Sequence, residues 1–134
     1  MERDLKKWQK PLLWACEIVL ALDSALAAQE TEVKKGDTVL VHTGWGRFWT
    51  DAAKTLSGEP GLGRTCAKWA VDHDIFCWGC DQFATDPLPF ETEGEALPMH
   101  LEMLTKAGIR LMEISTWTRW WKRKYMSFVS LQRP

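Results

Sequence analysis

The stretch GDTVLVHTGW, residues 36–45, decides the fold of this chain. The three apolar residues at its centre, 39–41, include two β-branched ones, which is typical of a strand covered on both faces in a parallel or mixed sheet. The glycines on either side of Trp45 turn the chain at the carboxyl end of this strand, where open α/β sheets place their ligands. We therefore expect a strand over residues 38–43 and the edge of a site at Trp45.

The sequence that follows predicts a strand-helix-strand unit. A loop over residues 44–61 leads to a helix near residues 62–72 and a second short buried strand at residues 75–80. The apolar stripe of this helix consists of Leu62, Cys66, Trp69 and Ala70. If the two strands are parallel, Asp81 reaches the same sheet edge as Trp45.

A second helix and a third strand carry the strongest chemical signal. Pro98 suits the first turn of a helix, and Gly108 suits the left-handed residue that ends it. After Gly108, the alternation of Ile109, Leu111 and Glu113 places a carboxylate on the face that two aliphatic residues bury. A buried carboxylate needs a partner, so this face is predicted to hold one.

His100 is the expected partner of Glu113. Eight helical residues separate His100 from Gly108, which is about 12 Å, and five strand residues separate Gly108 from Glu113, which is about 16 Å. Antiparallel packing of helix and strand therefore brings the two side chains to similar height. Imidazole and carboxylate are ligands that zinc and manganese accept, although two ligands leave a site incomplete. The alternative is that His100 caps its helix and Glu113 reaches water.

The N-terminal segment resembles a secretory signal only in part. Its apolar run over residues 11–22 precedes a small-residue stretch at 25–27 that would suit cleavage. Glu17 within the run and Asp23 after it are unfavourable in such a signal, and 12 residues are too few to cross a bilayer. We predict an amphipathic helix over about residues 20–30 and a cytoplasmic protein without a membrane partner.

Composition predicts a single domain over residues 1–134. The chain is 46% hydrophobic and 26% charged with a net charge of −1, which gives no field that would attract nucleic acid. Nine tryptophans exceed what one small core buries, so some should face a partner or a missing segment, and we expect association through an aromatic surface, as a homo-oligomer. The basic aromatic run at residues 119–125 is the alternative signal for an anionic surface or nucleic acid.

Two alternative functions stay open beside a metal site. Cys77 and Cys80 have the spacing of a thiol-redox pair, but such a pair needs a helix after the first cysteine, and the proline-containing segment 81–89 does not sustain one. Four cysteines in apolar contexts do not indicate a disulfide scaffold. The second alternative is a non-catalytic interaction domain.

The order of the motifs resembles the second half of the cyclase family, which includes bacterial kynurenine formamidase and isatin hydrolase. The likeness covers about residues 17–134 and leaves 1–16 as a poorly matched extension. The matching segments are Gly36-Asp37 with residues 39–45, Pro60-Gly61-Leu62, Trp78-Gly79-Cys80-Asp81, Leu97-Pro98-Met99-His100, and Gly108-Ile109 with Glu113.

The resemblance implies an α/β fold with a mixed sheet and packed helices, as in the swivelling β/β/α domain of that family. It implies a metal-dependent hydrolase of linear or cyclic amides, arylformamidase-like, with an aryl formamide such as N-formylkynurenine from tryptophan catabolism as substrate. By resemblance, His100 and Glu113 are ligands of a divalent zinc or manganese ion. Trp45 and Asp81 would lie near the substrate pocket.

Departures from the family pattern are equally informative. The upstream HxGTHxD-type motif, which supplies the other ligands and the catalytic histidine, is absent from this sequence. Ile114 stands where the family often has Asn or Gly, and a tryptophan-rich run at residues 117–121 replaces a leucine-rich helix. We therefore expect a truncated domain with a partial metal site, no assigned catalytic residue and little activity on its own.

Overall fold

The computed structural model describes residues 9–59, 61–115 and 129–130. The elements in chain order are α1 (Gln9–Ala28), β1 (Thr38–His42), the 3₁₀ helix η1 (Trp45–Phe48), α2 (Ala52–Leu56), α3 (Gly63–Asp72), β2 (Cys77–Cys80), α4 (Pro98–His100), the π-helical segment η2 (Leu101–Lys106), β3 (Arg110–Met112) and β4 (Val129–Ser130). The tryptophan-rich and basic aromatic runs predicted at residues 117–125 lie outside the described residues.

The four strands form one sheet in the order β3-β2-β1-β4. In its register Val39 lies opposite Trp78, and Trp78 lies opposite Leu111. Every described pair is parallel, whereas a mixed sheet was predicted. A helical crossover joins β1 to β2 and β2 to β3, and such a connection returns the chain in its original direction. The predicted α/β class is confirmed.

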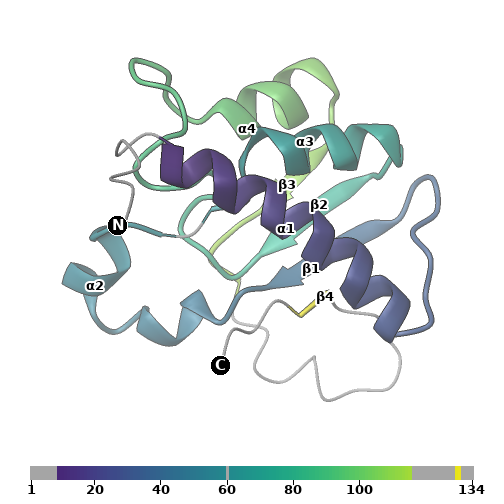
Figure 1. The fold of residues 1–134 in the computed structure, drawn as a ribbon, viewed down its shortest axis with the longest axis horizontal. Helices are drawn as coiled ribbons and strands as arrows, with labels where there is room; N and C mark the ends of the chain where they lie inside the picture. The colour runs from purple at the N-terminus through teal and green to yellow at the C-terminus, as the bar shows by residue number, and fades with distance from the viewer. Residues whose placement is uncertain (1–8, 60, 116–128, 131–134) are drawn as a thin grey trace, which may run out of the picture.

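The hydrophobic core lies between one face of this sheet and helices α1, α3 and α4. Figure 1 shows α1 in front of the strands with α3 beside it. The buried cluster includes Leu22, Val39, Val41, Leu62, Cys66, Trp69, Ala70, Trp78, Met99, Met103 and Ile109. The predicted apolar stripe of α3 is thus fully part of the core. Each large side chain removed from water contributes about 1.5–3 kcal/mol to folding.

Helix α1 is longer than the sequence predicted. The expected helix over residues 20–30 forms the second half of an element that starts at Gln9 and ends at Ala28. Beyond the end of the helix, Glu30 turns the chain with a left-handed φ of 50°. Leu22 is fully buried and Leu26 packs against the core, so the segment that imitated a cleavage site is structural.

Two further predictions need correction or addition. The segment expected as a loop over residues 44–61 contains η1 and α2, the latter capped by the Asp51 carboxylate, which accepts from Lys54 N–H. Gly108 ends the second helix with φ 70°, as predicted, but much of that helix has π geometry. In the described residues no helix is both long and apolar enough to cross a membrane.

Candidate functional site

His100 and Glu113 meet beside the carboxyl end of the sheet. The Nε2 atom of His100 lies 3.2 Å from Oε2 of Glu113. The prediction that the two side chains lie at a similar height along the helix and the strand is therefore confirmed. The side chains keep 24% and 21% of their surface exposed, so solvent reaches both. Helix α4 carries His100, and Glu113 follows directly after β3.

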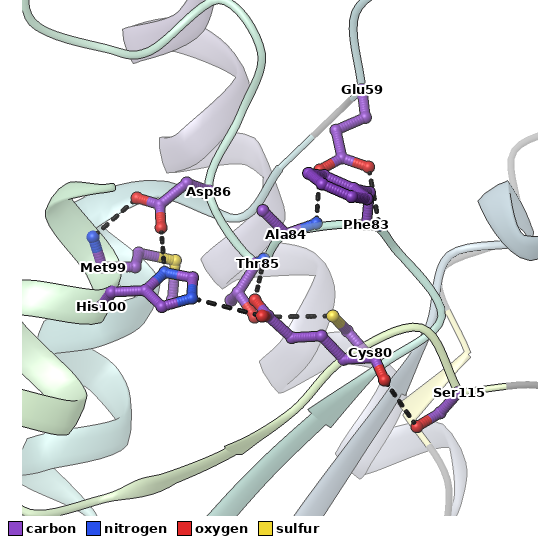
Figure 2. A network of polar contacts seen from close by, with 10 residues as sticks. Glu59, Cys80, Phe83, Ala84, Thr85, Asp86, Met99, His100 and Ser115 are labelled. Carbon is purple, nitrogen blue, oxygen red and sulfur yellow. Dashed lines mark hydrogen bonds and ion pairs between the residues drawn. The ribbon is translucent and has the colours of Figure 1, made fainter. Parts of the chain in front are cut away.

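Asp86 holds the opposite side of the His100 ring (Figure 2). Its Oδ2 atom lies 2.7 Å from Nδ1 of His100, and its Oδ1 atom accepts from Met99 N–H over 2.6 Å. Asp86 is fully buried, and it both orients the ring and accepts a free N–H group in the first turn of α4. A carboxylate on Nδ1 fixes the proton there and turns Nε2 toward Glu113.

The protonation of His100 depends on the position of its ring between the carboxylates of Asp86 and Glu113. Burial lowers the pKa of His100, but the hydrogen bond that its ring donates to Asp86 and the negative charges of Glu113 and Asp86 outweigh burial and raise the pKa above 6.5. With a neutral ring, Nε2 and the Glu113 oxygen are two acceptors facing each other. A proton or a cation between them is therefore required by the geometry.

Backbone amides of the loop at residues 81–86, which follows β2, hold two carboxylates. Thr85 N–H donates to Oε1 of Glu113 over 2.6 Å, which leaves Oε2 for His100. Phe83 and Ala84 N–H donate to the two oxygens of Glu59 over 2.9 and 2.7 Å. Three consecutive amides thus bind two acids, and Figure 2 shows Glu59 with its donors Phe83 and Ala84.

Asp81 and Trp45 do not join this network in the described residues. The Asp81 carboxylate is 2% exposed and accepts from Thr43 N–H and Oγ1–H, and from Gly44 and Gly46 N–H, at 2.7–3.2 Å. The carboxyl ends of β1 and β2 lie side by side, as predicted, and the hydrogen bonds of Asp81 link them. Trp45 packs edge-on to Phe48 with ring centroids 5.0 Å apart. A substrate contact at either residue stays a prediction.

The thiol-redox interpretation is wrong. Cys77 and Cys80 lie three residues apart on strand β2, so their side chains point to opposite faces of the sheet and cannot form a disulfide. Both are buried free thiols. Burial raises the pKa of Cys77 above 9 and that of Cys80 to about 12, so neither offers a thiolate.

The donor set of the pair fits a divalent metal, although it does not complete a site. Nitrogen and oxygen ligands at about 2.1 Å from a tetrahedral ion lie roughly 3.4 Å apart, close to the 3.2 Å between His100 Nε2 and Glu113 Oε2. Asp86 supplies the carboxylate that ligand histidines usually have on their other nitrogen. The described residues hold no group of three or more His, Cys, Asp or Glu side chains able to bind a metal.

Comparison with known families decides the relationship of this chain. The family model named Cyclase, described as "Putative cyclase", matches residues 14–87, more than half of the 134 residues. This chain belongs to the cyclase family. Searches of curated proteins and of solved structures found no match. The matched range contains Asp81 and Asp86 and stops before His100 and Glu113.

Sequence reasoning missed Asp86 and Glu59. Asp86 precedes Pro87 in the loop that follows a buried strand, and an acid at that sheet edge is a recognisable signal for a site. Glu59 lies in a Gly-Glu-Pro-Gly turn, where an exposed acid is the ordinary expectation. No local pattern predicts that its carboxylate reaches amides 24 and 25 residues away.

Proposed function

We propose that this cyclase-family chain supplies half of a divalent metal site for amide hydrolysis. The observation that carries the proposal is the placement of His100 Nε2 beside Glu113 Oε2, with Asp86 on the other ring nitrogen. Zinc and manganese are the ions that suit this pair. Two ligands do not hold a catalytic ion alone, so further ligands and the base have to come from residues outside this pair.

The residues of this chain have separable tasks in such a site. A bound metal would supply activated water and polarise the scissile carbonyl. His100 and Glu113 would be ligands through Nε2 and Oε2. Asp86 keeps the proton of His100 on Nδ1, and Thr85 N–H occupies Oε1 of Glu113 so that the other oxygen faces the ion. The pair binds metal only when His100 is unprotonated.

The substrate class comes from the family resemblance. We propose an aryl formamide, such as N-formylkynurenine, or a related lactam, with Trp45 as the aromatic contact. The HxGTHxD-type motif, which the family uses for its other ligands and its base, is absent from this sequence. Hydrolysis would therefore require such a motif from residues outside this sequence. Association of copies through aromatic residues is part of the same proposal.

Calorimetric titration with zinc and with manganese tests the half-site. We expect micromolar binding by the full chain, lost in the His100→Ala and Glu113→Ala variants. His73→Ala is the matched control, because His73 lies against the end of α3 and bonds to Trp69 O. Absence of binding, or binding that both variants retain, would overturn the proposal and leave the interaction-domain alternative. Binding would justify assays of formamide hydrolysis with a chain that carries the missing motif.

A further inference from the structure

Glu59 is a buried acid that the mechanism above does not use. It is 3% exposed, and its two carboxylate oxygens accept from Phe83 and Ala84 N–H over 2.9 and 2.7 Å. Its main-chain carbonyl accepts from Leu88 N–H over 3.0 Å. Glu59 therefore holds both ends of the stretch from residue 83 to residue 88 by hydrogen bonds, through its side chain at one end and its main chain at the other.

The residues that follow Ala84 determine the geometry of the candidate pair. Thr85 N–H binds Glu113, and the Asp86 side chain binds His100. Figure 2 shows Glu59 against Phe83 and Ala84, with Thr85 and Asp86 next along the loop toward His100. Because adjacent peptide planes share a Cα atom, the position of Ala84 constrains where the next two residues direct their donors and acceptors.

We propose that Glu59 is a positioning residue for the His100–Glu113 pair. It acts through the 81–86 loop, since its carboxylate fixes the loop backbone and the loop in turn orients both side chains. The oxygens of Glu59 are buried and bonded to the loop, so Glu59 is not a catalytic residue. The inference rests on the proposed function in one respect, which is that the positioned pair binds a metal ion.

The two hydrogen bonds from Phe83 and Ala84 N–H to the Glu59 carboxylate, here called the clamp, respond to protonation of Glu59. Burial raises the pKa of Glu59 to about 7 against the effect of its two N–H donors, and the negative charges of Glu113 and Asp81 raise it further. When the carboxyl group takes up a proton, one oxygen becomes a hydroxyl and a poorer acceptor, so one loop amide loses its best partner. The clamp is therefore firm above neutral pH and weaker below it.

Nuclear magnetic resonance tests the clamp without any metal. In the full chain we expect the amide protons of Phe83 and Ala84 to shift with a midpoint near pH 7, as the Glu59 carboxyl group titrates. In Glu59→Gln this titration of the two amide protons disappears, and at pH 8 His100 shows a mixture of the two neutral tautomers. Glu91→Gln is the matched control, because Glu91 also accepts a backbone N–H, from Arg64, outside this loop.

A second measurement separates this inference from the proposed function. At pH 8 we expect the zinc dissociation constant to rise about tenfold in Glu59→Gln and to stay unchanged in Glu91→Gln. If the unmodified chain binds no zinc, the proposed function fails, while the tautomer and amide signals still decide the role of Glu59. His100 signals in Glu59→Gln identical to the unmodified chain would overturn the positioning role. If Glu59→Gln does not fold, the amide protons of Phe83 and Ala84 in the unmodified chain decide the matter, and absence at pH 8 of the downfield shift that a carboxylate acceptor causes would overturn the positioning role.

Discussion

Ile114 N–H donates to the main-chain carbonyl of Gln82 over 2.8 Å, and Ile114 adopts a left-handed φ of 56° in making this bond. The bond ties the residue after Glu113 to the 81–86 loop, in addition to the Thr85 contact with the Glu113 side chain. A β-branched residue is strained at positive φ, where Gly and Asn are tolerated. Ile114 therefore occupies a backbone position that Gly or Asn would fit with less strain.

Replacing Ile114 by asparagine should stabilise the fold. The side chain is 54% exposed, so little packing is lost, and the strain of a left-handed residue is relieved by roughly 1 kcal/mol. The measurement is the midpoint of urea unfolding for Ile114→Asn, with Leu104→Asn as a control, since Leu104 is similarly exposed but lies in η2. A lower midpoint for Ile114→Asn would contradict the strain argument.

Asp86→Asn should change the tautomer of His100 more than it changes the fold. An asparagine oxygen can still accept from Met99 N–H, but its amide group would donate to Nδ1 and move the ring proton to Nε2. That proton then blocks the position beside Glu113, and zinc affinity should fall about tenfold to a hundredfold. Nitrogen chemical shifts of the ring and calorimetry are the two readouts. Unchanged shifts would remove Asp86 from this role.

Stability of the chain should fall as the pH rises from 5 to 8. The folded pKa of Glu59, about 7, lies above its ordinary value of 4.5, so the folded state binds the extra proton and loses its advantage as the pH rises through 7. His100, whose folded pKa is raised above 6.5, contributes in the same direction. With allowance for solvent screening, the Glu59 effect amounts to roughly 1–2 kcal/mol. Urea unfolding at pH 5 and at pH 8 measures this change in the free energy of unfolding. The difference between the two pH values should be smaller in Glu59→Gln.

Local sequence patterns predicted most of the helices and strands. The features that the sequence did not predict depend on contacts between residues that are far apart in the chain. Strand β1 and helix α3 follow from apolar runs and periodicity with Gly and Pro at their ends, and the meeting of His100 and Glu113 follows from the lengths of two regular elements. The environment of Glu59 depends instead on the fold of the 81–86 loop, which has no periodicity. Short helices such as α2 depend on a single capping residue and were missed for that reason.

Gln82 provides the last test, because its buried amide group has no hydrogen-bond partner among the described residues. The side chain is 0% exposed, and both Oε1 and Nε2 lack a partner there. An unsatisfied buried amide costs about 1–3 kcal/mol, and an apolar side chain of similar shape avoids that cost. Gln82→Met should therefore raise the free energy of unfolding by roughly 1 kcal/mol or more. Gln82→Ala is the control, since it also removes the amide but leaves a cavity and should be destabilising. If Gln82→Met is destabilising to the same degree as Gln82→Ala, the amide has a partner in solution, and its loss rather than its burial dominates.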